Sequence, residues 1–279
     1  MSTTKPAFTS NRLVPRKFFG SWGLHLLLTT MALGLALPFA WMVLTSFKPM
    51  TEVQSTSWIP TTWQPSNYME VFTVVPYAKF YWNSLFIASW VTTLQVLTSA
   101  LAAFSFSRCQ WAGRDKVFLL YLSTMMLPGL VMMIPNYQIM ITLGLVDSYM
   151  GLILPAAFSA FGTFLLRQFM LTISSSIDES AEIDGASKWR LFWDIILPLC
   201  RPGLITLTIF TFMGNYNSFF WPLVMLKSES KYTLPIGLLF FDSTRGQSTH
   251  LMMAAVTMAV IPMILLFILL QKYLVKGIQ

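Results

Sequence analysis

The residues of this chain that could do chemistry are few, and most lie inside long apolar stretches. Amide and aromatic side chains recur there as Asn215-Tyr216-Asn217 followed by Trp221, as Asn136 and as Gln95. Amides donate and accept hydrogen bonds and aromatic rings stack on apolar faces, so this chemistry suits the binding of a hydroxyl-rich ligand. An amide in lipid must also find a partner, and hydrogen bonding between helices is an equally good explanation.

Residues that could carry catalysis are scarce. His25 and His250 are far apart in the sequence, and Cys109 and Cys200 form neither a disulfide framework nor a CxxC spacing. A metal site needs convergent donors, so we expect none. The sequence contains no G-x-x-x-x-G-K-[ST] loop to hold nucleotide phosphates. We therefore expect a protein that is not an enzyme and binds no cofactor itself.

The composition indicates a membrane protein. Of the 279 residues, 55% are hydrophobic and only 10% are charged, whereas about 25% are charged in soluble domains. The mean hydropathy of +0.63 agrees, and together these values exclude a conventional soluble enzyme. A pI near 9.5 would suggest nucleic acid in a soluble protein, but in a membrane protein it first raises the question of sidedness, so we expect no nucleic acid.

Six stretches without Asp, Glu, Lys or Arg are long enough to cross a bilayer, which takes about 20 apolar residues. These windows are residues 18–47, 80–107, 117–146, 148–166, 202–226 and 246–271. We expect one helix in each, with a short turn at residues 144–148, where Asp147 divides the third window from the fourth. The predicted fold class is an all-α polytopic membrane protein with six transmembrane helices.

Basic residues divide unevenly between alternate loops. Thirteen of the 18 Lys and Arg residues fall on one side and five on the other, so the positive-inside rule puts both termini in the cytoplasm. We expect residues 1–17 to form a cytoplasmic N-terminal segment and residues 18–279 the transmembrane domain, with an external loop at 48–79 and a cytoplasmic loop at 171–201. Prolines in the external loop exclude a long helix, and this loop is either a lid on the outer headgroups or a docking surface.

The cytoplasmic loop is predicted to hold two short helices. Ser176 and Glu179 have the spacing of a capping box, so the first helix should start there. Gly185 should end it, because glycine adopts the left-handed conformation without steric cost. Ser187 can cap the second helix, which Pro198 should end.

An aromatic stripe marks the second of these helices. Trp189, Phe192, Trp193 and Ile196 recur at i, i+3, i+4 and i+7. The stripe either packs on the protein's own helices and the headgroups or enters a cleft of a soluble partner. Five acidic and two basic residues between positions 178 and 194 make this loop −3 on an otherwise basic face, which fits a partner contributing arginines.

This loop closely resembles the E-A-A-x3-G-x9-I-x-L-P motif of ATP-binding-cassette importer permeases. It reads Glu179-Ser180-Ala181, then Gly185, then Ile195-x-Leu197-Pro198, with Ser180 in place of the usual second alanine. Other segments resemble the carbohydrate branch of that family, the maltose-type second permeases. These segments are Ser46-Phe47-Lys48-Pro49, Asn67-Tyr68, Asn217-x3-Trp221-Pro222-Leu223 and Gln271-x-Tyr273-x-Val275-Lys276-Gly277.

The resemblance implies a type I importer permease in the bacterial inner membrane, with ATP hydrolysed on a partner chain. The implied partners are a homologous second permease chain, two ATP-binding subunits that hold ATP and Mg, an extracytoplasmic sugar-binding protein and the lipid bilayer. Coupling to the ATPase would be carried by Glu179, Ala181, Gly185, Leu197 and Trp189. The substrate pathway would be lined by Asn215, Asn217, Tyr216, Trp221, Asn136 and Gln95.

The substrate class implied is a di- or oligosaccharide or a glycoside-type osmolyte such as glucosylglycerol. A permease for glycerol phosphodiesters is an alternative within the same family. An ion-coupled secondary transporter is a second alternative, but such proteins normally carry an ionisable residue at mid-membrane, and none of the six windows has an Asp, Glu, Lys or Arg.

Overall fold

The computed structural model describes residues 18–243 and 248–276, and within these ranges the chain is helical without a strand. Three helices are long and apolar enough to cross a membrane, namely α1 (Phe18–Ser46), α3 (Tyr77–Arg108) and α15 (Thr249–Lys276). Three bent helix pairs satisfy the same criterion when each pair is taken as one span. The all-α membrane prediction is confirmed, and a total of six spans stays a prediction.

The bent pairs and the short helices complete the fold. In the first pair, α4 (Arg114–Ser123) and η2 (Thr124–Met126) meet α5 (Gly129–Thr142) at a bend of 102°. In the second, α6 (Met150–Ala156) meets α7 (Ala160–Leu171) at 40°. In the third, the segment Lys188–Leu199 meets α11 (Arg201–Tyr216) at 77°. The segment Lys188–Leu199 consists of α9 (Lys188–Arg190), the π-helix η3 (Leu191–Ile196) and α10 (Leu197–Leu199). The other elements are η1 (Met50–Glu52), α2 (Asn67–Val74), α8 (Ser175–Ile183), α12 (Phe220–Met225), η4 (Glu229–Lys231), α13 (Leu234–Gly237) and α14 (Phe240–Ser243).

The prediction of one helix per window is wrong for the third, fourth and fifth windows, each of which holds two helices. In the third, Pro128 disfavours helix at the residue before it, and Leu127 is extended (φ −81°, ψ 122°). In the fourth, α7 starts anew at the N-cap Ser159, whose Oγ accepts from the Gly162 N–H at 3.0 Å. In the fifth, α11 ends at Tyr216 and α12 begins at Phe220.

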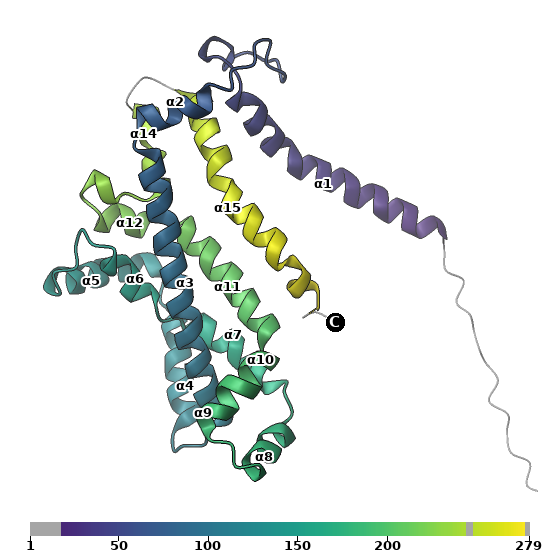
Figure 1. Ribbon diagram of the computed structural model, residues 1–279, viewed down its shortest axis with the longest axis vertical. Helices are drawn as coiled ribbons and strands as arrows, with labels where there is room; N and C mark the ends of the chain where they lie inside the picture. The colour runs from purple at the N-terminus through teal and green to yellow at the C-terminus, as the bar shows by residue number, and fades with distance from the viewer. Residues whose placement is uncertain (1–17, 244–247, 277–279) are drawn as a thin grey trace, which may run out of the picture.

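Helix α3 is the axis of the molecule, with α7 and α11 alongside it (Figure 1). Three clusters of buried side chains follow one another along α3, and each includes α3 residues, such as Phe80, Val91 and Phe104. Close packing needs glycine at one crossing, because a Cβ on Gly162 of α7 would lie 2.5 Å from Ser99 Oγ of α3. The long second window thus supplies the scaffold on which the shorter helices pack.

Helix α1 behaves differently from the others. It leaves the bundle and slants away from it, making contact with α15 (Figure 1). None of its most apolar stretch is buried, and side chains such as Trp22 and Leu35 are more than 70% exposed. This helix is therefore covered by lipid or by another chain.

The external loop contains no long helix, as its prolines predict. It folds back on the end of α1, where Asn67 Nδ2 donates to Ser46 O and Lys48 O, both at 2.9 Å. The buried Lys48 ammonium donates to Ser57 O at 2.6 Å. These bonds give the loop a defined structure. Such a structure is compatible with both roles considered from sequence, a lid on the outer headgroups and a docking surface.

The turn predicted at Asp147 is confirmed, with Gly144 at φ 67° and Asp147 at φ 56°. The Asp147 carboxylate accepts hydrogen bonds from the backbone N–H groups of Lys227 and Ser228 at 3.0 Å and from Ser228 Oγ at 2.5 Å. Lys231 Nζ lies 3.0 Å from the same carboxylate. These bonds, first of all those from Ser228, hold the pKa of Asp147 well below its usual range.

Asn83 of α3 extends this polar cluster. Its Nδ2 donates to Tyr232 O at 2.9 Å, and its Oδ1 accepts from the Tyr149 hydroxyl at 2.8 Å. Asp147, Asn83 and their partners therefore join α3, the 144–149 turn and the 227–232 segment. The charge count predicts that this turn and this segment lie on the same, external, side.

We predict that Asp147→Asn lowers the melting temperature of the purified chain, measured by circular dichroism in detergent. A carboxyl group whose pKa is lowered in the folded state stabilises the folded chain at pH values above its unfolded pKa of about 3.9. This stabilisation is lost as the pH falls through the folded pKa. The difference in melting temperature between Asp147→Asn and wild type should therefore be constant above about pH 5 and shrink below about pH 4. Glu229→Gln, on the exposed part of the same segment, is the control and should melt like wild type at every pH.

Candidate functional site

The first helix of the cytoplasmic loop begins at a different serine from the one predicted. Helix α8 spans Ser175–Ile183, and its N-cap is Ser174, whose Oγ accepts from the Ser176 N–H at 3.3 Å. The predicted capping box of Ser176 and Glu179 is therefore wrong: Ser176 lies within the helix, and its Oγ pairs with Ser174 Oγ at 2.8 Å. Glu179 lies on the exposed surface of α8.

Gly185 ends α8 as predicted. Its φ of 76° is left-handed, its N–H donates to Glu182 O at 3.0 Å, and the Ala186 N–H donates to Ala181 O at 2.9 Å. This pair of bonds is a Schellman motif, which satisfies the last carbonyls of a helix. Because the motif reverses the chain, α8 and the second helix of the loop project from one tight corner.

The second helix begins at Ser187, whose Oγ accepts from the Arg190 N–H at 3.3 Å, so the predicted cap is confirmed. Its middle turns form the π-helix Leu191–Ile196, with the Leu197 N–H donating to Phe192 O. Pro198 has no N–H to donate to Asp194 O, and its ring crowds that carbonyl, which favours the wider turn. The helix ends at Leu199, one residue beyond the predicted stop.

The aromatic stripe divides between the two environments considered from sequence. Phe192 and Ile196 are buried in the cluster around Phe104, whose ring centroid lies 5.2 Å from that of Phe192. Trp189 is 65% exposed and Trp193 46% exposed. One half of the stripe therefore fixes the helix to the bundle, while the two indoles are free to meet another surface.

The five predicted coupling residues lie in three environments. Glu179, Gly185 and Trp189 are exposed, Ala181 is buried against the bundle at 7% exposure, and Leu197 is half-buried. Leu197 lines a groove of about 270 Å³ together with α3 and α11. The loop thus contains both exposed and anchored positions.

One ion pair closes the corner between the two helices. Lys188 Nζ of the second helix bonds to the Glu182 carboxylate of α8. The hydrogen bond that Lys188 donates to the Glu182 carboxylate raises the pKa of Lys188 above its usual value. Both side chains are about half exposed, so this pair contributes little to stability.

Two of the predicted pathway residues share a cavity of about 230 Å³. Asn136 of α5 and Trp221 of α12 line it together with Gly129, Met133, Pro155 and Ala156. Trp221 Nε1 donates to Gly151 O at 3.3 Å, which fixes the indole against α6. The cavity therefore presents an amide and an aromatic face with no charged side chain in its lining.

The other four pathway residues lie elsewhere. Gln95 Nε2 of α3 donates to Thr211 Oγ1 of α11 at 3.2 Å, which is a bond between helices, whereas Asn215 Nδ2 donates to Thr211 O within α11 at 2.8 Å. The buried Tyr216 hydroxyl donates to Ala259 O of α15 at 2.9 Å, which is a bond between helices. Asn217 is exposed and donates to Met213 O of its own helix at 3.0 Å.

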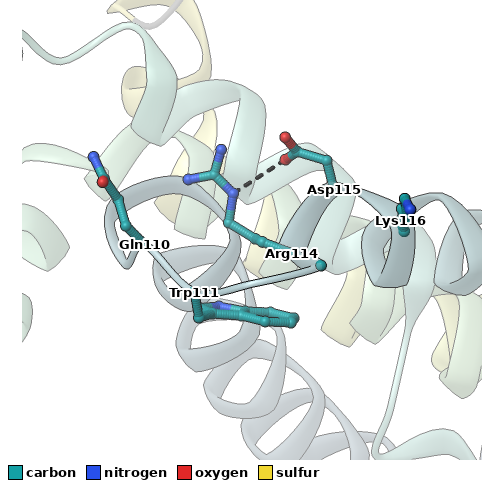
Figure 2. Close-up of a pocket in the computed structure, with 6 residues that line it drawn as sticks. Gln110, Trp111, Arg114, Asp115 and Lys116 are labelled. Atoms are coloured by element: carbon teal, nitrogen blue, oxygen red, sulfur yellow. Dashed lines mark hydrogen bonds and ion pairs between the residues drawn. The ribbon is translucent and has the colours of Figure 1, made fainter.

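A polar hollow of about 400 Å³ lies at the turn from α3 to α4 (Figure 2). Arg114 Nε and Asp115 Oδ1 lie 3.1 Å apart there, and Asp115 is 70% exposed. Arg167 of α7 stacks on Phe118 of α4, with its guanidinium carbon 4.3 Å from the ring centroid. Arg167, whose side chain is only 16% exposed, thus joins α7 to α4 beside this turn.

Sequence reasoning missed a buried ion pair between Arg108 at the end of α3 and Asp178 of α8. From the sequence alone, Asp178 counts only toward the net charge of −3 on the loop. The one signal of this pair in the sequence is a difference in charge: the basic Arg108 directly follows the second window, whereas the cytoplasmic loop is acidic. Within the described residues, no group of three or more His, Cys, Asp or Glu side chains could hold a metal ion.

Residues 95–279 match the family described as "Binding-protein-dependent transport system inner membrane component". The chain belongs to this family. It is accordingly a permease subunit of an ATP-binding-cassette importer, a multi-pass protein of the inner membrane. The resemblance inferred from the cytoplasmic loop is confirmed.

Similar proteins support this membership over nearly the full chain. The permease is 32% identical to the arabinooligosaccharides transport system permease protein AraQ of Halalkalibacterium halodurans, covering 92% of this chain and 94% of that protein. It is 35% identical to the sn-glycerol-3-phosphate transport system permease protein UgpE of Yersinia pestis, covering 73% of each chain.

A solved structure also has the same fold as the permease. This structure is a bacterial ABC transporter involved in the import of the acidic polysaccharide alginate. The match has a TM-score of 0.81 at 25% identity and covers 96% of this chain and 99% of the other. The importer permease fold expected from the cytoplasmic loop is thus matched over 96% of the chain.

We predict that Phe192→Ala destabilises the permease by about 3–5 kcal/mol, because it empties a fully packed position. Trp189→Ala, which truncates an exposed ring three residues earlier, should change stability by no more than about 0.5 kcal/mol. Thermal unfolding of the purified variants measures both. Equal melting temperatures for the two variants would contradict the division of the stripe.

Proposed function

We propose that this permease forms half of the translocation pathway of an ATP-driven sugar importer and couples to a separate ATPase through the loop 176–198. One observation carries the proposal. The Schellman turn at Gly185 presents two short helices whose outer residues, Glu179, Ile183 and Trp189, are exposed, while Ala181 and Phe192 anchor them to the bundle. Such a helical knob fits a cleft in a soluble partner.

The complete importer would contain this chain, a homologous second permease, two ATP-binding subunits that hold ATP and Mg, and an extracytoplasmic sugar-binding protein. Closure of the ATPase dimer would move the cytoplasmic loop and switch the two permeases from inward-facing to outward-facing. The net charge of −3 on the loop favours an ATPase cleft that contributes arginines. An ion-coupled secondary transporter is set aside, because the family is binding-protein-dependent.

The substrate we propose is a neutral di- or oligosaccharide or a glycoside such as glucosylglycerol. The cavity between α5, α6 and α12 supports this class, because Asn136 can bond hydroxyl groups and Trp221 can stack on a sugar face. A glycerol phosphodiester, the alternative, would need a cationic partner, and the cavity lining has none.

Coupling is tested by Gly185→Asp, which we predict abolishes ATP-dependent uptake while membrane insertion persists. A side chain at φ 76° costs about 1–2 kcal/mol, and the added charge alters the surface offered to the ATPase. Gly113→Asp is a matched control, because Gly113 also has a left-handed φ of 86° and open space around its Cβ position, yet lies outside the loop. Uptake in proteoliposomes of the complete importer is the measurement. Normal transport by the Gly185→Asp complex would contradict the assignment of the loop 176–198 as the element that couples to the ATPase.

The substrate pathway is tested by Asn136→Ala and Trp221→Ala, which we predict raise the transport KM or lower the maximal rate by about tenfold, the value of one to two lost contacts. Gln138→Ala, an exposed position on the same helix, is the control. The double variant Asn215→Ala with Asn217→Ala tests the second amide group, and an unchanged profile would remove that group from the pathway. Arabinotriose, maltose, glucosylglycerol and sn-glycerol 3-phosphate form the first panel, and binding of the same panel to the partner receptor identifies the substrate.

A further inference from the structure

A largely buried ion pair joins the membrane helices to the cytoplasmic loop outside its sequence motif. Arg108 Nη1 lies 2.8 Å from Asp178 Oδ2, and the two side chains are only 6% and 16% exposed. Arg108 is the last residue of α3, and Asp178 lies in the first turn of α8. A pair this deep is weakly screened by solvent and depends on good geometry.

The same guanidinium also holds the end of α7. Its Nη2 donates to Met170 O and, at 2.8 Å, to Ile173 O. The planar fork of arginine offers several donors in a fixed arrangement, which the ammonium of lysine cannot copy. One side chain therefore ties together three elements: the end of α3, the end of α7 and the start of α8.

Little else attaches α8 to the bundle. Its one buried residue is Ala181, which packs in the cluster that contains Ala103 and Phe104 of α3. The opposite surface is open, with Ile183 86% exposed. Small apolar contact permits sliding, so the direction and reach of α8 depend on the ion pair.

The pair is not arranged for maximal stability. Arg108 Nε and Asp178 Oδ1 are buried, and neither has a hydrogen-bond partner among the described residues. Apolar residues can often replace a buried ion pair without loss of stability, whereas a fixed geometry is what such a pair supplies. Its position between α3, α7 and α8 is therefore better explained by transmission of movement than by stability.

We propose that the Arg108–Asp178 pair makes α8 move as one body with the ends of α3 and α7, so that displacement of the coupling loop reaches the membrane helices. This inference rests on the proposed function, and both residues act as positioning residues. The pair is the mechanical connection, and the exposed surface of the loop is the contact with the ATPase.

The first experiment measures the connection itself, independently of transport. Spin labels are placed at Ile183→Cys on α8 and Leu97→Cys on α3, both exposed positions, in a chain whose native cysteines are replaced by alanine. The distance distribution in the assembled complex should be narrow with the native pair and broader with Asp178→Asn. An unchanged distribution overturns the proposal.

The second experiment measures transmission, as the amount of arabinotriose taken up per ATP hydrolysed in proteoliposomes. We expect Asp178→Asn to keep ATP hydrolysis but to lower this ratio by about tenfold, within the usual range of coupling energies. Arg108→Lys, which keeps the charge and loses the fork, should lower it by a smaller factor. Asp115→Asn removes the exposed carboxylate of the hollow in Figure 2 and should leave the ratio unchanged.

The outcomes separate the two proposals. If the ion pair has only a structural role, Asp178→Asn lowers uptake and ATP hydrolysis together, in proportion to the complex recovered. The amount of sugar taken up per ATP hydrolysed then stays at the wild-type value, and this result would also overturn the inference. If the wild-type complex takes up none of the sugars in the panel, the proposed function fails instead. The label distances then still decide whether the pair fixes α8 to α3.

Discussion

A chain in lipid must satisfy its own backbone hydrogen bonds, and this constraint decides where the helices of this permease can break. The breaks fall at residues that leave few groups unpaired. Pro128 has no N–H, and Ser159 caps α7 with its own hydroxyl. At the 77° bend near Cys200, the Cys200 N–H still donates to Ile196 O and the Leu204 N–H to Cys200 O, both at 3.0 Å. The chain therefore bends sharply there with a backbone hydrogen bond retained on each side of the bend.

Because breaks are permitted only at such places, the molecule divides its tasks between long and broken helices. The unbroken α3 serves as the frame, since all three buried clusters include its residues. The broken helices form the cavity lined by Asn136 and Trp221, where α5, α6 and α12 meet. Both ends of α3 are joined to loops by polar side chains, Asn83 toward the external segment and Arg108 toward the cytoplasmic one. A shift of α3 would therefore move the segments bonded to it at both surfaces.

The sequence could predict the features that depend on local chemistry. Scarcity of charge located the membrane windows, Gly185 and Ser187 marked helix ends correctly, and the motif around them identified the family. It could not choose among the three consecutive serines at 174–176 as the N-cap, because each has the same capping chemistry. Helix breaks within uncharged windows were also missed, since hydrophobicity does not distinguish a straight span from a bent one.

Features that depend on long-range packing lay beyond sequence reasoning. Periodicity grouped Phe192 with Trp189 and Trp193, but only contact with Phe104 determines which of these rings is buried. Arg108 and Asp178 are 70 positions apart, and no local pattern pairs them. The amides show the same limit, because Asn136 lines a cavity while Gln95 and Asn215 bond at Thr211.

Helix α1 has a consequence that concerns the bilayer rather than the importer. Its 29 residues make a rod of about 43 Å, at about 1.5 Å per residue, which exceeds the roughly 30 Å of hydrocarbon in a typical membrane. Where lipid covers α1, the tilt of this helix adjusts to the thickness of the bilayer, because its apolar stretch is not buried in the bundle as that of α3 is in part. The angle between α1 and the bundle should therefore follow acyl-chain length, making this helix the part of the protein most responsive to a change in membrane composition.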